Sequence, residues 1–269
     1  MKEFTYYGVP KKITKVLADA YPLISYNQVQ RLLKNKDIKV CGQRISSDVV
    51  ICDASPIVVY DKAQSLKTIY SDSELLVVYK PKGIASEGEV SAESMLAETD
   101  KSLILCHRLD TNTDGLLMFA KNDKAFNEIQ NGFKNKSIAK HYRARVYGKI
   151  LNDCRLTDYL VKEVKGNRVM IFAEKVKGGV EVVTDCKVTG YDGETTLVDL
   201  VIFSGKMHQI RAQLAYHKHF ILGDSKYGRD DINRKLGFKK QQLTANKLTF
   251  SFPDSSYLRY LNDKNIEID

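Results

Sequence analysis

The sequence predicts an α+β fold in two parts of unequal size. In the longer part, residues 68–269, short apolar runs typical of strands outnumber the helical patterns and do not alternate strictly with them. This argues against a doubly wound parallel sheet. In the shorter part, residues 1–62, two amphipathic helical patterns come before a small hairpin. The polar segment DKAQSLK, residues 61–67, has the composition of a linker between two domains.

The composition favours a folded protein of the cytoplasm. Apolar residues make up 43% of the 269 residues, enough for a sizeable core, and no apolar run approaches the ~20 residues that a membrane helix needs. The opening residues, MKEFTYYGVPKK, lack the apolar stretch of a secretory signal. The 5 cysteines are scattered and form no CxxC, which indicates neither a disulfide framework nor a zinc site. We therefore expect a cytoplasmic monomer with no membrane segment.

The charge balance favours an anionic partner. Lysine and arginine number 42 against 33 acidic residues, for a net charge of +9. A basic surface concentrates polyanions and releases their counterions on binding, so nucleic acid fits this balance. A basic protein with no such partner fits it as well, and the choice depends on the motifs.

Two helical patterns make up much of the shorter part. The second starts near Ser25, which has capping-box spacing to Gln28. Apolar side chains repeat at the spacing of one helix face. In the first helix these inward residues are Ile13, Val16, Leu17 and Ala20, and in the second they are Tyr26, Val29, Leu32 and Leu33.

The hairpin and the basic residues around it resemble a known RNA-binding module. The segment SYNQVQRLLKNKDIKVCGQRI is similar to the αL RNA-binding domain of the ribosomal S-four type, over about residues 10–60, although Cys41 replaces the usual Asn and Asp37 a frequent Gly. The resemblance implies that the outward basic residues contact RNA, although each could also be an ordinary solvated charge. These residues are Lys34, Lys36, Lys39 and Arg44.

Apolar runs and alternation predict the main elements of the longer part. Asn122 is placed to cap a helix that has Phe126, Ile129 and Phe133 on one face. The segment KHYRARVYG alternates, with Tyr142 on its apolar side. Further strands are expected at residues 75–79, 116–120 and 195–203, and a turn followed by a helix at 205–217, with Ile210, Leu214 and His217 on its packed stripe.

The segment HRLDTNTDGLLMFAK, residues 107–121, admits more than one interpretation. Its DTNTDG core resembles the start of a calcium loop, but such a loop needs a glutamate at its twelfth position, where Lys121 stands. The loop also runs directly into the apolar residues LLMF, as a polar turn entering a buried strand would. Calcium is therefore disfavoured, and we expect no metal.

This segment is similar to the HRLDxxTSGLLLxAK motif of the RluA-type pseudouridine synthases. Further segments match that family in order over about residues 70–230: LLVVYKPKGI, KHYRARVYG and SGKMHQIRAQLAYHKHFILGDSKYG. The resemblance implies a pseudouridine synthase fold with a mixed, mainly antiparallel central sheet. It also implies isomerisation of uridine in structured RNA without cofactor, in large-subunit ribosomal RNA first and in transfer RNA as the alternative.

The resemblance also implies roles for individual residues. Asp110 is the catalytic carboxylate, which attacks the sugar or the base or removes a proton from the sugar; these routes stay open. Arg211 is expected to pair with Asp110 and hold it ionised, through a planar fork that can bind a carboxylate at two points. Tyr142 is expected to stack on the flipped uracil, with a core tyrosine as the alternative, and Arg108 to fill the space that the base leaves.

Other residues of the motifs are assigned less central roles. Lys206 and His208 are expected to contact RNA, and His107 to be structural. Asp114 stands where the family usually has Ser. Because a second carboxylate facing the site would oppose ionisation of Asp110, we expect Asp114 to point to solvent or to pair with a basic residue. Further departures are Lys206 for Arg, Met207 for Thr, and Glu87–Gly88 for His–Pro.

A non-catalytic RNA-binding or ribosome-assembly factor built on the same scaffold is the competing hypothesis. A decayed enzyme would be free to lose any member of the catalytic set. The joint presence of Asp110, Tyr142 and Arg211 therefore favours the enzyme.

Overall fold

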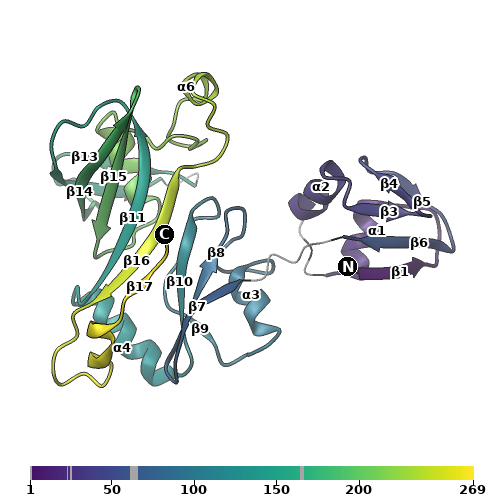
Figure 1. Ribbon diagram of the computed structural model, residues 1–269, viewed down its shortest axis with the longest axis horizontal. Coiled ribbons are helices and arrows are strands. Elements are labelled where there is room, and N and C mark those ends of the chain that lie inside the picture. The colour runs from purple at the N-terminus through teal and green to yellow at the C-terminus, as the bar shows by residue number, and fades with distance from the viewer. Residues whose placement is uncertain (1, 23, 25, 61–65, 164–166) are drawn as a thin grey trace. The chain divides into compact units, whose positions relative to one another are not determined.

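The chain forms two compact units, Met1–Ser65 and Leu66–Asp269 (Figure 1). The computed structural model describes residues 2–22, 24, 26–60, 66–163 and 167–269. Most of the segment expected to be a linker, residues 61–65, and the expected helix-capping residue Ser25 lie outside the described residues.

The N-terminal unit is built on a 4-stranded antiparallel sheet with the order β1-β6-β3-β4. The expected hairpin is β3 and β4, and its turn passes through Cys41 and Gly42, both at positive φ. The strand β1 (Lys2–Tyr6) was not expected, and it pairs with β6 along its whole length. The other strands are β3 (Ile38–Val40), β4 (Gln43–Ile45) and β6 (Ser55–Val59), with a separate pair β2 (Lys11–Lys12) and β5 (Val50–Ile51).

Helices α1 (Ile13–Ala20) and α2 (Tyr26–Lys34) supply much of the core of this unit. The inward positions expected from the helical spacing are buried except at the two ends of the pattern. Ala20 is exposed in the last turn of α1, and Tyr26, the first residue of α2, is 69% exposed. Those two assignments were wrong, and position in a terminal turn is not the reason, because Ile13 at the start of α1 is fully buried.

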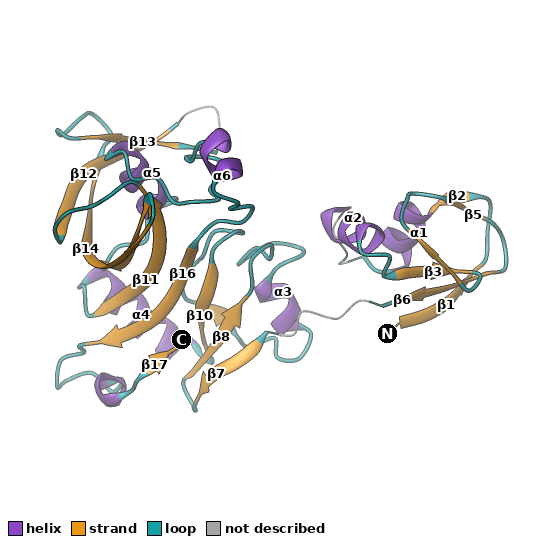
Figure 2. Cartoon of the chain, turned by 45° about the horizontal axis from the view of Figure 1, so that its top comes forward, coloured by secondary structure: helices purple, strands orange, loops and turns teal. Residues whose placement is uncertain are grey.

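The C-terminal unit is built around one large sheet (Figure 2). In the described residues this sheet has 11 strands. Its main path runs β13-β12-β14-β15-β11-β16-β10-β8-β7, with β17 beside β16 and β9 beside β10. Every neighbouring pair is antiparallel except β10 and β16, so the sheet is mixed and mainly antiparallel, as expected. The strands are β7 (Lys67–Ser71), β8 (Leu75–Lys80), β9 (Ile104–Leu105), β10 (Asp114–Ala120), β11 (Ile138–Tyr147), β12 (Cys154–Lys162), β13 (Val169–Phe172), β14 (Val180–Asp192), β15 (Thr195–Ile202), β16 (Leu243–Phe250) and β17 (Ile266–Glu267).

Short helices accompany this sheet. Asn122 caps α4 as expected, because its side chain accepts a hydrogen bond from the Ala125 amide at 2.8 Å. Helix α4 packs against β10 and β11, and α5 packs against β12 and β13. None of the described helices is long and apolar enough to span a bilayer. The helices of this unit are α3 (Ala92–Ala97), α4 (Asp123–Lys134), α5 (Gln209–Tyr216), α6 (Asp230–Lys235) and the 3-10 helix η1 (Arg259–Asp263).

The parallel pairing of β10 with β16 fixes the start of β10. Asp114 and Gly115 lie opposite Thr244 and Ala245. Gly115 has φ +121, and a Cβ there would collide with the backbone of Ala245, so glycine is required for this close approach. The glycine thereby fixes the position of the loop that precedes β10.

Candidate active site

Asp110 lies in the loop between β9 and β10, and the residue before it is tightly held. The Ser86 hydroxyl donates to the Leu109 carbonyl and accepts from the Leu109 amide, both at 2.8 Å. On the other side the Thr113 amide donates to the Asp110 carbonyl at 3.0 Å, which closes a turn. The Asp110 side chain is 27% exposed, so it faces an opening.

Arg211 on α5 contacts two carboxylates. Its Nη1 donates to Oδ2 of Asp110 at 2.7 Å. Its Nε and Nη2 donate to the two oxygens of Asp224 at 2.7 and 2.9 Å. The expected pairing of Arg211 with Asp110 is present, but the expected two-point fork is made with Asp224. Asp110 is held at one oxygen, and among the described residues nothing donates to its Oδ1.

Asp224 was missed in the reading of the sequence, although it lies in the quoted segment GDSKYG. Its side chain has no exposed surface. Burial alone would raise the pKa of Asp224, but the hydrogen bonds and charge of Arg211 and the amides of Lys226 and Tyr227 lower it below its usual range. Asp224 is therefore an anion that fixes the orientation of Arg211.

The pKa of Arg211 shifts in the opposite direction. Its own burial would lower that pKa, but Asp224 and then Asp110 raise it. Arg211 is thus a permanent cation between two carboxylates.

His208 and Tyr227 complete the surroundings of this ion pair. The expected helix near Met207 begins at Gln209, and His208 is its N-cap residue with φ 55. Nδ1 of His208 lies 3.0 Å from the Tyr227 hydroxyl, and Nε2 lies 3.9 Å from Oδ2 of Asp110. Burial, the largest influence, lowers the pKa of His208 and favours a neutral ring. The Tyr227 ring also lies 5.3 Å from the Arg211 guanidinium.

Buried glutamines fasten α5 to the sheet. Gln213 donates to Oδ2 of Asp158 at 2.8 Å and accepts from the Thr184 hydroxyl at 2.7 Å. Gln209 donates to the Val183 carbonyl at 3.1 Å and accepts from the Ser204 hydroxyl at 2.7 Å. A helix held by satisfied buried groups is rigid, so Arg211 is presented from a fixed support.

A small cavity of about 50 Å³ lies beside Asp110 and Arg211. Tyr142, from β11, lines it and is 6% exposed. Burial first, and the charge of Asp110 second, raise the pKa of Tyr142, so its hydroxyl stays protonated. The expected catalytic residues therefore share one cavity. The full lining is Arg108, Leu109, Asp110, Thr113, Lys140, Tyr142, Ile202, Gly205, Lys206, His208, Gln209, Ile210, Arg211 and Leu243.

Arg108 and Lys206 are located where the cavity meets solvent. The Arg108 side chain is 67% exposed and pairs with Glu87 at 2.7 Å. Lys206 is exposed, and its backbone amide donates to Gln209 at 3.3 Å. Both charged groups can therefore reach a ligand that lies over the opening.

His107 and Asp114 lie outside the cavity lining. The His107 ring packs edge-on against Phe133, and Nε2 accepts from the Met118 amide at 3.3 Å. Burial lowers its pKa to about 3, which favours a neutral ring near neutral pH and agrees with a structural role. Asp114 pairs with Lys82 at 3.5 Å and accepts from the Tyr79 hydroxyl at 2.8 Å. Of the two placements expected for Asp114, pairing with a basic residue is the one found.

Lys80 is a buried cation that was not singled out in the sequence. It has no exposed surface. Its ammonium donates to the carbonyls of Pro81, Ile84 and Thr111 at 3.3, 2.8 and 3.4 Å. Burial lowers its pKa to about 8, against the opposing effect of Asp114 and Asp110. The sequence could have marked Lys80, because it lies within LLVVYKPKGI, one of the segments that match the family.

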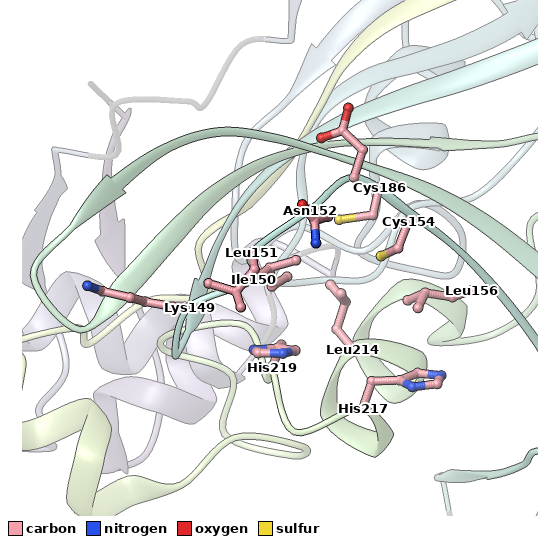
Figure 3. A pocket seen from close by; sticks show the side chains of 11 residues that line it. Lys149, Ile150, Leu151, Asn152, Cys154, Leu156, Cys186, Leu214, His217 and His219 are labelled. Atoms are coloured by element: carbon pink, nitrogen blue, oxygen red, sulfur yellow. The ribbon is translucent and has the colours of Figure 1, made fainter.

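A second, larger cavity of about 420 Å³ is lined by Leu214 and His217, at the other end of α5 (Figure 3). The thiols of Cys154 and Cys186, from residues opposite each other on β12 and β14, also line it. Its described lining includes one carboxylate, Asp153, and no arginine. It also includes Lys149, but it lacks the carboxylate–guanidinium pair that Asp110 and Arg211 form in the first cavity.

The chain is similar to known RNA pseudouridine synthases. The sequence pattern of the family described as RNA pseudouridylate synthase matches residues 74–216. The chain is 28% identical to the ribosomal large subunit pseudouridine synthase C of Rickettsia conorii, over 83% of this chain and 84% of that protein. It is 29% identical to the uncharacterized RNA pseudouridine synthase YlyB of Bacillus subtilis, over 90% of this chain and 86% of that protein.

The fold is similar to solved human structures. The human RNA pseudouridylate synthase domain containing 1 aligns with a TM-score of 0.61 at 23% identity, over 76% of this chain and 82% of that one. The human RNA pseudouridylate synthase domain containing 4 aligns with a TM-score of 0.58 at 22% identity, over 68% and 84%. The mixed central sheet with few helices is thus the fold of pseudouridine synthases.

Proposed function

The chain belongs to the RNA pseudouridylate synthase family, and on this premise we propose that it is an RluA-type enzyme that uses Asp110 to isomerise uridine in folded RNA. One observation carries the assignment. Asp110 has one oxygen held by Arg211 at 2.7 Å while the other has no described donor, in a cavity that Tyr142 also lines. An ionised carboxylate with a free oxygen can act as nucleophile or base. The reaction requires no net oxidation, so we expect no cofactor.

The charges of the site maintain this state of Asp110. Arg211 is positively charged at every accessible pH, and its bidentate contact with buried Asp224 prevents it from following Asp110. The negative charge of Asp110 is thereby balanced without its second oxygen being occupied. Asp114, the other carboxylate of the motif, is engaged by Lys82 and Tyr79 and does not line the cavity of Asp110.

The remaining groups suit a base taken out of its stack. Extrusion of a nucleotide costs roughly a few kcal/mol, which contacts to the flipped base and to the gap must offset. The Tyr142 ring is proposed to stack on the uracil, and the Arg108 side chain, 67% exposed, to occupy the vacated position. Lys206, at the mouth of the cavity, and His208, which lines it, are proposed to contact the RNA.

Large-subunit ribosomal RNA is the proposed substrate. Several relatives are named ribosomal large subunit pseudouridine synthase C, and a net charge of +9 suits a large polyanion. Transfer RNA is the alternative. Either substrate agrees with the cytoplasmic location expected from the cysteine pattern.

The primary test is direct. The purified protein is incubated with RNA that carries tritium at C5 of uracil, a hydrogen that is lost when this carbon joins the ribose. We expect release of tritium from large-subunit ribosomal RNA, and mapping of pseudouridines with and without the gene should identify the position. Absence of release from ribosomal and transfer RNA alike would refute the proposed activity and favour a non-catalytic RNA-binding protein.

We further propose that the N-terminal unit is an αL-type domain, residues 1–62, that binds RNA through its basic residues. Lys34 and Lys36 are exposed, and among the described contacts neither forms an ion pair. Arg44 and Lys39 lie over the Tyr60 ring at 4.6 and 5.5 Å. Cations next to an aromatic face can bind phosphate and stack on a base together.

Replacement of both Lys34 and Lys36 by Gln is expected to weaken RNA affinity with little change in the single-turnover rate constant at saturating RNA. The slope of log affinity against log salt is negative, and each lost phosphate contact should make it shallower by about 1. Filter binding at several salt concentrations measures both quantities. The control is Lys15→Gln, an exposed lysine on α1. An unchanged affinity, or a fall confined to the chemical rate, would contradict the proposed role.

A further inference from the structure

Lys140 is a largely buried cation whose ammonium has no hydrogen-bond acceptor in the part of the chain that the structure describes. It lies on β11 and is 5% exposed. Among the described residues no carbonyl, hydroxyl or carboxylate accepts a hydrogen bond from its ammonium, and the contact found for it is the Phe133 ring at 4.8 Å. Burial lowers its pKa to about 8, and no carboxylate raises it. An unpaired buried charge is costly, so its retention indicates a partner that arrives with a ligand.

Lys80 provides an internal comparison. Both lysines are buried and both have a pKa lowered to about 8. Lys80 donates to three carbonyls, as a structural lysine does. Lys140, in contrast, lines the cavity that contains Asp110, and none of the described residues accepts a hydrogen bond from the three donors of its ammonium.

The position of Lys140 relative to Tyr142 suggests which ligand atom it meets. Lys140 and Tyr142 are two residues apart on β11, so their side chains point to the same face of the strand, and both are buried; their Cα atoms are roughly 6.6 Å apart at the strand rise. Gly205 covers the ammonium so closely that a Cβ at that position would collide with it. Lys140 is therefore within reach of the edge of a base that stacks on Tyr142.

The depth of Lys140 favours the base over the phosphates as its partner. The RNA backbone is expected to stay at the surface, where the exposed Lys206 is available to it. The flipped base is the part of the nucleotide that enters a closed pocket. A uracil edge offers two carbonyl oxygens, which are acceptors that a lysine ammonium matches.

We propose that the Lys140 ammonium donates a hydrogen bond to a carbonyl oxygen of the flipped uracil and stabilises the negative charge that develops on the ring. This inference rests on the proposed pseudouridine synthase activity. It makes Lys140 a catalytic residue in addition to Asp110, Tyr142 and Arg211.

The charge develops by each route open to Asp110. If the bond between C1′ and N1 breaks, its electron pair stays on uracil and is delocalised onto the carbonyl oxygens. If Asp110 adds to C6 of the ring, the electron pair of the C5–C6 double bond moves to the oxygen on C4. Lys140 donates a hydrogen bond without losing its proton, so no atom or electron is left unbalanced. A donor aimed at developing negative charge acts as an oxyanion hole does.

The test combines two substitutions in the full-length protein. Lys140→Met removes the charge and keeps a side chain of similar length, and the control is Lys187→Met, an exposed lysine on β14 of the same sheet. We expect Lys140→Met to lower the single-turnover rate constant roughly 10²-fold with little change in RNA affinity. Lys140→Arg should recover part of the rate.

A modified substrate identifies the atom. Sulfur accepts hydrogen bonds more weakly than oxygen, so RNA with 2-thiouridine or 4-thiouridine at the target should slow the wild type more than Lys140→Met. Chromatography of the digested nucleosides follows both substrates. If neither sulfur substitution distinguishes the two proteins, or if Lys140→Met loses affinity and not rate, the proposal is overturned.

Folding is controlled in the same set. Loss of an unpaired buried charge should leave the melting temperature equal or higher, and Lys140→Gln repeats the test if Met packs badly. A wild-type rate retained by either folded neutral variant refutes the role of Lys140 and leaves the proposed function intact. Inactivity of the wild type itself refutes the function and this inference together.

Discussion

Replacement of Asp110 by asparagine is expected to abolish pseudouridine formation while RNA binding persists. Asparagine keeps the shape of the side chain and one carbonyl-type acceptor for Arg211, but it cannot act as a nucleophile or a base. The rate should fall by roughly four orders of magnitude or more, which is the scale of loss when a central catalytic group is removed. Tritium release measures the rate, and filter binding measures the affinity.

Asp114→Asn is the matched control for this variant. Asp114 belongs to the same motif, but it contacts Lys82, Tyr79 and Thr244 and does not line the cavity. We expect it to retain most of the activity. Substantial release by Asp110→Asn, or equal losses in both variants, would contradict the assignment of the reactive carboxylate to Asp110.

The elements that the sequence could predict are those in which a local pattern determines the structure. The Asn122 cap and the alternation around Tyr142 need only neighbours in the chain, and both are present as expected. Strand β16 (Leu243–Phe250) was not expected, although it pairs with both β10 and β11. Its sequence LTANKLTF contains Asn and Lys among its apolar residues, so its central place in the sheet depends on partners far away in the chain.

In the site, too, some features could be predicted from the sequence and others depend on distant parts of the chain. The motif resemblance brought Asp110, Tyr142 and Arg211 into one set, and one cavity contains them. The resemblance could not say which carboxylate holds both ends of the Arg211 fork, because that depends on the path of the chain after α5. Asp224 takes this position since the turn at residues 223–227 directs its side chain inward, where two backbone amides also donate to it.

That the Lys140 ammonium lacks an acceptor among the described residues could not be predicted from the sequence either. In the sequence Lys140 begins an alternating strand and could have been a solvated lysine. Its burial results from the loop at Gly205 and from Phe133 on α4, two segments distant from each other in the chain. A missing partner becomes visible only when the surrounding groups have been placed.

Replacement of Asp224 by alanine is expected to destabilise the protein by about 3–5 kcal/mol, the usual cost of removing one partner of a buried ion pair. The Arg211 side chain is 8% exposed and that of Asp224 has no exposed surface. The variant would leave a buried guanidinium with Asp110 alone to balance it. Because Arg211 would then turn towards Asp110, activity should fall together with stability. Denaturant unfolding measures the first effect and tritium release the second.

The chain offers a matched control in Asp185→Ala. Asp185 binds Arg155 through the same two-point geometry, at 2.5 and 2.9 Å, but the two side chains are 36% and 66% exposed. Water screens this pair, so its loss should cost only a small fraction of the loss at Asp224. Similar losses in the two variants would show that burial does not determine the strength of the Arg211 pair.

The difference in free energy of unfolding between wild type and Asp224→Ala should change with pH in a defined direction. The pKa of Asp224 is lower in the folded protein than its ordinary value, so the unfolded chain binds more protons in that range. The contribution of the pair is complete above the ordinary pKa of about 3.9, and it is lost as pH falls through the folded value. The stability gap should therefore be constant near neutral pH and narrow in acid. A gap that widens on acidification would mean that Asp224 is protonated in the folded protein, and Arg211 would then depend on Asp110 alone.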